Sequence, residues 1–114
     1  MPIPPLQKTD AETKLKSFCE SRVPQHARDQ VNLSYEIRGI SITLYENRVP
    51  WKAVTNWSKK AIAQFRYNSK NNDWTLYCAD RNEKWFVYTE IDPSRNIADL
   101  INEVTEDPTC IFWG

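Results

Sequence analysis

The sequence predicts an α+β fold in which a five-stranded antiparallel meander sheet has one helix before it and one helix after it. Apolar residues recur at helical spacing near the two ends of the chain, whereas the middle holds segments in which apolar and polar residues alternate. Short loops join the consecutive strand segments. Such loops indicate antiparallel pairing, because parallel strands need long crossover connections.

The first helix is predicted over about residues 10–21. Thr9 and Glu12 have the spacing of a capping box, in which each side chain bonds the backbone of the other residue. Apolar residues follow at helical spacing. The helix should end before Pro24, since the residue before a proline avoids the α conformation.

Five strands are expected between the helices, over residues 31–38, 41–47, 61–67, 74–79 and 84–90. The first strand begins with Val31 and Leu33, which start a regular alternation of apolar and polar residues typical of a strand with one buried face. Gly39 should supply the turn after this strand. An irregular connection carrying Trp51 and Trp57 precedes the third strand.

The second helix should begin between Asp92 and Asn96 and end before Pro108. Its buried stripe is predicted at Ile97, Leu100, Ile101 and Val104. The chain closes on an apolar tail, in which Ile111 and Trp113 are expected to dock on the core. Two helices can cover only one face of a five-stranded sheet, so the other face is solvated, covered by loops, or used for binding.

Length and composition favour one small domain. The chain has 114 residues, near the most common domain size of about 100–150 residues. We expect residues 1–8 to be a flexible Pro-rich lead-in and residues 9–114 to form a single α+β domain. Fifteen basic residues balance fifteen acidic residues, whereas a dedicated nucleic-acid binder usually carries a basic excess.

Several functional classes are disfavoured by missing residue types. The two glycines cannot build a phosphate-binding loop, and a single histidine with three scattered cysteines offers no zinc-ligand spacing. We therefore expect neither a metal nor a cofactor. The chain shows no signal peptide and no stretch of ~20 apolar residues, which predicts a cytoplasmic protein without a membrane partner.

A weak catalytic candidate lies between the first helix and the first strand, where Arg22, His26, Arg28 and Asp29 are close in sequence. Histidine is the usual general base near neutral pH, and Asp29 could orient it. No nucleophile is evident beside it, so we favour a structural role for these residues. A pair of Cys19 with His26 is weaker still, because Cys19 falls on the apolar side of the helix.

The predicted sheet is rich in aromatic residues with interleaved arginines. We expect an uncovered face that bears Tyr77, Phe86 or Tyr88 with Arg66, and we add Arg81 from the neighbouring turn as a binding residue. Such faces can stack bases or anchor a protein partner. Ordinary cross-strand packing is the alternative explanation for most of these rings, and the hairpin register cannot be fixed from the sequence.

Several segments together resemble one known family. They are residues 22–30, 35–39, 50–51, 63–67, 74–77 and 80–82, Trp85, and the closing residues 107–114. This pattern is similar to short bacterial proteins catalogued as domain of unknown function 3024, over about residues 15–114. The terminal Ile-Phe-Trp-Gly and the Phe-Arg-Tyr segment are its more specific parts. The resemblance implies no activity.

The sequence therefore favours a small non-enzymatic module that binds a protein partner or a second copy of itself through an aromatic and arginine-bearing sheet face. A single-stranded nucleic-acid binder is one alternative, which the zero net charge disfavours. A small enzyme centred on the segment from Arg22 to Asp29 is the other.

Overall fold

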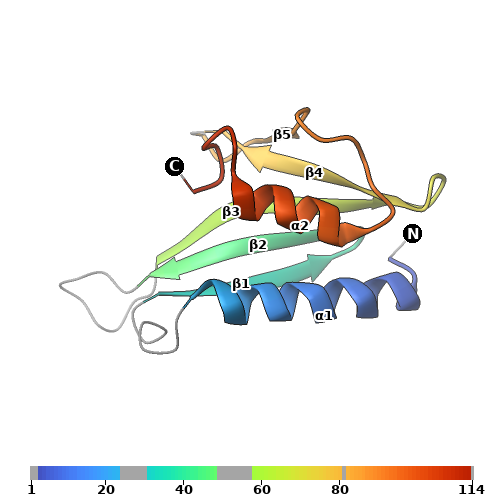
Figure 1. Cartoon of the computed structure of the whole chain (residues 1–114), viewed down its shortest axis with the longest axis horizontal. Coiled ribbons are helices and arrows are strands. Elements are labelled where there is room, and N and C mark those ends of the chain that lie inside the picture. Colours follow the sequence, from blue (N-terminus) through green and yellow to red (C-terminus); the bar gives the residue numbers. More distant parts are fainter. Residues whose placement is uncertain (1–2, 24–30, 49–57, 81, 114) are drawn as a thin grey trace.

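The computed structural model describes residues 3–23, 31–48, 58–80 and 82–113 and contains the predicted order of elements (Figure 1). The elements are α1 (Pro5–Arg22), β1 (Val31–Arg38), β2 (Ser41–Arg48), β3 (Ser58–Asn68), β4 (Asp73–Ala79), β5 (Trp85–Val87) and α2 (Ile97–Glu106). All neighbouring strands pair antiparallel in the order β1-β2-β3-β4-β5. The predicted α+β class and meander are confirmed.

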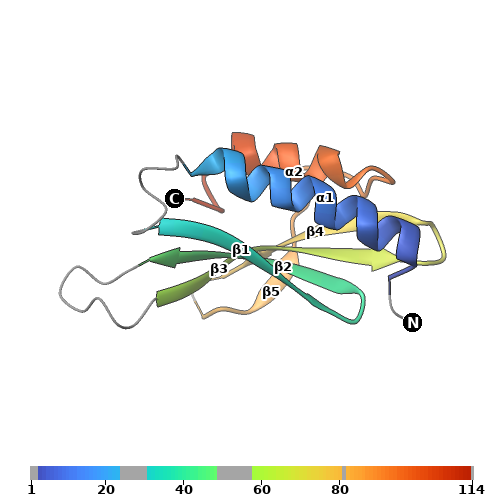
Figure 2. The ribbon, with the colours of Figure 1, turned by 90° about the horizontal axis from the view of Figure 1, so that it is seen from below.

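Both helices lie on the same side of the sheet, and the described part of the chain places no helix on the other side (Figure 2). We call the covered side the inner face and the opposite side the outer face. Residues directly opposite each other on paired strands point to the same face. One inner row is Ile37, Ile42, Phe65 and Leu76, and the outer row beside it is Glu36, Thr43, Gln64, Tyr77 and Val87.

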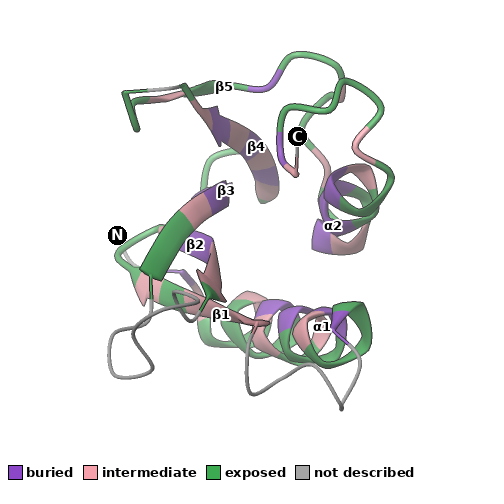
Figure 3. Ribbon diagram, turned by 90° about the vertical axis from the view of Figure 1, so that its left-hand side faces the viewer, coloured by how far each residue is buried: buried purple, intermediate pink, exposed green. Residues whose placement is uncertain are grey.

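The hydrophobic core lies between the inner face and the two helices, where buried positions gather on the facing sides of the helices (Figure 3). The stripe predicted for the second helix is confirmed, since all of its members are buried: Ile97, Leu100, Ile101 and Val104. The first helix contributes Ala11, Leu15 and Phe18. Neither described helix is long and apolar enough to cross a membrane.

The first helix starts earlier than the sequence pattern suggests. It begins at Pro5, where a proline is tolerated because the first helical residues have no intrahelical partner for their N–H groups. The predicted start near Asp10 is wrong, and Thr9 is not a cap because it lies inside the helix, where its carbonyl accepts a hydrogen bond from the Thr13 hydroxyl. Residues 5–8, expected to be lead-in, form the first turn, and Ile3 ahead of them is buried in the core.

Strand boundaries differ from the predicted ones mainly in β3 and β5. The third strand is longer and contains a bulge, because Leu44 pairs with Ala63 while the next residue, Tyr45, pairs with Ala61. The fifth strand is shorter, and Ser94 completes the edge of β4 by exchanging two backbone hydrogen bonds with Trp74. The connection that carries Trp51 and Trp57 lies outside the described residues.

The C-terminal tail is held to the second helix by one carboxylate. Asp107 adopts the left-handed conformation (φ 43°) that ends α2, and its oxygens accept hydrogen bonds from the backbone N–H groups of Phe112 (3.1 Å) and Trp113 (2.9 Å). The indole N–H of Trp113 donates to the carbonyl of Val104 at 2.7 Å. The expected docking of Ile111 is wrong: its side chain is 40% exposed, and Phe112 is the buried residue.

Replacing Asp107 should destabilise the whole fold, because the change removes both hydrogen bonds to the tail and places a poorer residue in the left-handed conformation. Hydrogen bonds to charged groups contribute about 1.5–3 kcal/mol each. We expect Asp107→Ala to lower the free energy of unfolding in urea by about 2–3 kcal/mol. Asp107→Asn, which tolerates this conformation and keeps one acceptor oxygen, should lose about half as much. An unchanged urea midpoint for Asp107→Ala would show that the tail does not depend on this carboxylate.

Candidate functional site

The outer face carries arginine and aromatic side chains on neighbouring strands. Tyr45 lies on β2, Tyr77 on β4 and Trp85 on β5, and Arg38 and Arg66 stand on β1 and β3. All five share the outer face by cross-strand register. The sheet therefore presents rings and guanidinium groups side by side, as the sequence pattern suggested in general terms.

A chain of polar contacts crosses the middle of this face. The amide nitrogen of Gln64 donates to the hydroxyl of Thr43 at 2.9 Å, and its amide oxygen accepts from Nε of Arg66 at 2.6 Å. The guanidinium of Arg66 lies 3.8 Å from the ring centre of Tyr77. Thr43 and Gln64 are only 8% and 9% exposed, and buried polar groups of this kind need such partners. These contacts hold the guanidinium of Arg66 over the Tyr77 ring.

A second cation rests on a ring near the β1 edge. The ammonium of Lys59 lies 4.2 Å from the ring centre of Tyr45 and 2.6 Å from a carboxylate oxygen of Glu36. The hydrogen bond from Lys59 lowers the pKa of Glu36 below its usual value. Both side chains are well exposed, so the pair adds little to stability, but it fixes where the two charges lie.

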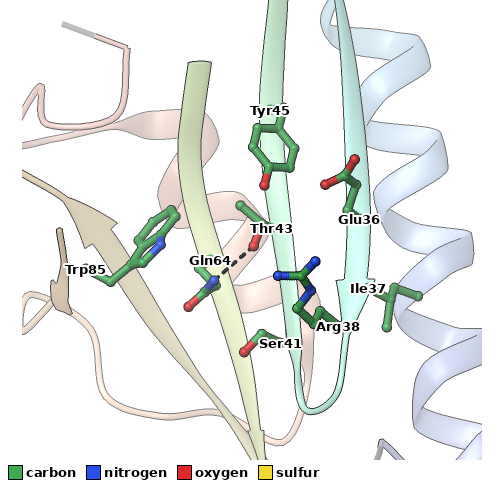
Figure 4. A pocket seen from close by; sticks show the side chains of 8 residues that line it. All are labelled: Glu36, Ile37, Arg38, Ser41, Thr43, Tyr45, Gln64 and Trp85. Carbon is green, nitrogen blue, oxygen red and sulfur yellow. Dashed lines mark hydrogen bonds between the residues drawn. The ribbon is translucent and has the colours of Figure 1, made fainter. Parts of the chain in front are cut away.

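The outer face is hollowed between these groups. A hollow of about 660 Å³ has Thr43 and Gln64 as its floor, with Tyr45 and Trp85 on different sides (Figure 4). Arg38 extends its guanidinium into the same space. Ile37 borders the hollow but points away from the other labelled residues, toward α1. Volumes of about 300–1,000 Å³ are typical of sites that bind small ligands.

The structure brings together some of the predicted binding residues and separates others. Arg66 and Tyr77 are in contact on the outer face. Phe86 and Tyr88 do not join them, because Phe86 pairs with Cys78 and Tyr88 bonds the backbone of Leu76, both of which face inward. The expectation that either ring shares a face with Tyr77 is therefore corrected.

Tyr88 is 4% exposed, and its hydroxyl donates to a carboxylate oxygen of Glu103 on α2 at 2.8 Å. This side chain is part of the packing between sheet and helix. Phe86 is 44% exposed at the edge of the sheet. Arg81 lies outside the described residues.

Sequence reasoning did not single out Arg38, Thr43, Tyr45, Gln64 or Trp85 as site residues. The register of β1 with β2 could have been predicted from the sequence, because the short turn at Gly39 sets Arg38 opposite Ser41. This register aligns Glu36 with Thr43. The alignment of Tyr45 depends on the bulge in β3 and could not be read from an alternating pattern.

The catalytic candidate is only partly described. Arg22 stands at the end of α1, with its guanidinium carbon 4.4 Å from the ring centre of Trp113, which gives this arginine a packing role. His26, Arg28 and Asp29 lie outside the described residues. Within the described part of the chain, no three His, Cys, Asp or Glu side chains gather in a way that could hold a metal ion.

The three cysteines are free thiols in different surroundings. Burial, together with the nearby carboxylate of Glu20, raises the pKa of Cys19 to about 11. Burial also raises the pKa of Cys78, whose side chain is completely enclosed. Cys110 is exposed in the C-terminal tail. The thiol of Cys78 in the core and the thiol of Cys19 packed against the core should therefore react slowly.

A thiol reagent should distinguish these positions. Only the thiolate reacts, and at pH 8 a thiol with a pKa of about 11 is ionised at a level on the order of one in a thousand. With DTNB at pH 8, we expect the native protein to lose one fast-reacting thiol, which peptide mapping should assign to Cys110. Unfolding in guanidinium chloride should make all three react. Fast modification of Cys19 in the native protein would contradict this assignment.

Comparison with known proteins agrees with the resemblance seen in the sequence. The family model of the domain of unknown function DUF3024 matches residues 3–114. This range contains both helices and all five strands. No curated protein and no solved structure matches the chain. The chain therefore belongs to the family of the domain of unknown function DUF3024.

Proposed function

We propose that this chain is a protein-binding module and that its partner lies across the outer face of the sheet. The observation that carries the proposal is the hollow that Arg38, Tyr45 and Trp85 surround on a face that no described helix covers. Binding rather than catalysis is proposed because this surface offers shape and contact groups without a nucleophile and base in contact.

The residue types on the outer face suit a protein interface. Tyrosine, tryptophan and arginine are enriched among the residues that carry most of the energy of protein–protein binding. Trp85, Tyr45 and Tyr77 are each partly exposed, so a partner can reach part of every ring. Val87 and Ile40 add apolar surface at the margin, at 45% and 40% exposure.

The charge of the face favours a protein over a nucleic acid. Its strand residues include the basic Arg38, Lys59 and Arg66 and the acidic Glu36 and Asp73. Lys59 is already paired with Glu36. Nucleic-acid affinity comes mainly from neutralising several phosphates, so this nearly balanced face is poorly suited to it.

Single-stranded nucleic acid remains the second candidate, since one observation favours it. Arg66 lies over the Tyr77 ring, and bases can stack on such combinations of an aromatic ring and an arginine. Fluorescence anisotropy with labelled oligo(dT) and oligo(U) at low salt tests this alternative directly, because such binding should weaken steeply as salt is added.

A photo-crosslinking amino acid placed at Val87 should capture a protein partner in the cells from which the chain comes. Val87 is exposed on the outer face, in the same row as Tyr77. We expect a discrete protein adduct by gel and mass spectrometry, resistant to nuclease. Adding Trp85→Ala should remove most of the adduct, because the ring that borders the hollow is lost.

The matched control carries the same amino acid at Asn102, which is exposed on α2 in the opposite layer. This position should give no such adduct. Circular dichroism of the Trp85→Ala variant should retain the wild-type spectrum and thermal midpoint within a few degrees. Equal adducts from both positions, a nuclease-sensitive adduct, or an adduct that does not need Trp85 would each contradict the proposal.

A further inference from the structure

Two hydrogen-bond donors that border the hollow have no hydrogen-bond partner among the described residues. The guanidinium of Arg38 and the indole N–H of Trp85 make no hydrogen bond or ion pair with another described residue. Both oxygen-bearing groups of the floor are engaged with each other or with Arg66. An occupant that supplies acceptor oxygens therefore complements this site better than one that supplies donors.

Glu36, a carboxylate that lines the same hollow, attracts Arg38 but makes its close contact with Lys59. Glu36 forms its short contact with Lys59, so the described charges at this end of the hollow are two positive groups, Arg38 and Lys59, and one negative group. Arg38 is exposed and reaches into the hollow beside the Thr43 floor (Figure 4). A guanidinium that makes no other hydrogen bond can bind a planar carboxylate with two parallel hydrogen bonds.

We infer that the protein partner inserts an acidic side chain into the hollow, where Arg38 binds its carboxylate and Trp85 contacts a neighbouring apolar side chain. This inference rests on the proposed function and names the chemistry that the site selects. An extended partner segment that crosses the five strands, at a spacing of ~4.8 Å, would contain about six residues at ~3.3 Å each.

A phosphate could supply the same acceptor oxygens, but the surroundings favour a carboxylate. Arg66 bonds Gln64 and lies over Tyr77, and Lys59 is paired with Glu36. Arg38 interacts with Glu36 only through electrostatic attraction, and its guanidinium makes no hydrogen bond with another described residue. A single such group matches one carboxylate. A phosphate backbone, with one negative charge per nucleotide, would need several cations along its path.

The test is a selection of displayed random peptides on the immobilised wild-type protein, with counter-selection on the bare support. The enriched peptides are then titrated against the wild-type protein and against the Trp85→Ala variant. We expect the enriched peptides to share an Asp or Glu next to an apolar residue. In titrations with the synthetic peptides, Arg38→Ala should weaken binding about tenfold or more, since the carboxylate loses a charge-assisted partner. Arg38→Lys should bind with intermediate affinity, because it keeps the charge without the paired geometry.

The matched control is Arg95→Ala, which removes an exposed arginine outside the outer-face strands and should leave the peptide affinity unchanged. Replacing the acidic residue of the peptide by Gln or Asn should abolish the effect of Arg38→Ala. A reversed-charge selection provides a further arm, in which Arg38→Glu should enrich peptides bearing Lys or Arg at the same place.

The outcomes separate this inference from the proposed function. Peptides that need Trp85 but lack acidic residues, with no effect of Arg38→Ala, would overturn the carboxylate assignment and leave the binding face intact. Enriched peptides that bind Trp85→Ala equally well would contradict both. Oligo(dT) or oligo(U) binding that depends on Arg38, with no peptide binding, would replace the protein partner by a nucleic acid.

Discussion

Cross-strand register is the constraint on which the two faces of this sheet depend. Side chains alternate between the faces, so a slip of one residue between β1 and β2 would exchange them. The turn at Gly39, which has a φ of 59° that glycine adopts at little cost, sets Arg38 opposite Ser41. Ile37 and Ile42 then face the helices, and Glu36 and Thr43 face outward. Burial of the apolar row makes this register the stable one.

The sequence predicts those parts of the fold whose patterns are local. The stripe on α2 follows from spacing alone and agrees with the structure, as does the packing of Leu33, Tyr35 and Ile37 of β1 against the core. Features set by distant contacts do not follow from spacing. The start of α1 depends on Ile3 reaching the core, and the choice of Phe112 over Ile111 depends on the bonds that Asp107 makes with the tail backbone. An irregular segment has no period from which its buried side can be predicted.

The candidate site was also predictable only where its signal is local in the sequence. A cross-strand contact such as that of Arg66 with Tyr77 was anticipated from residue types, because arginines and rings alternate along neighbouring strands. The register of β5 could not be anticipated from residue types. This register turns Phe86 and Tyr88 to the inner face. Trp85 takes its place on the outer face through that same register. The hollow itself arises from side chains on β1, β2, β3 and β5, and no single segment of the sequence carries its signal.

Thr43 and Gln64 show how the outer face can be both stable and open to a partner. They are nearly as enclosed as many core residues, yet they are polar, and their hydrogen bonds are completed within the face. Apolar residues here would extend the core outward as an exposed hydrophobic patch, which promotes nonspecific association. The polar pair instead holds Arg66 in one geometry, so a partner that contacts it avoids the ordering cost of about 0.5–1.5 kcal/mol for a mobile side chain. Arg38 has no such support, and its contribution to affinity must exceed the cost of ordering it. Specificity for the proposed carboxylate therefore comes from Arg38, while the fixed platform of Arg66 and Tyr77 adds contact area that depends less on the partner's sequence.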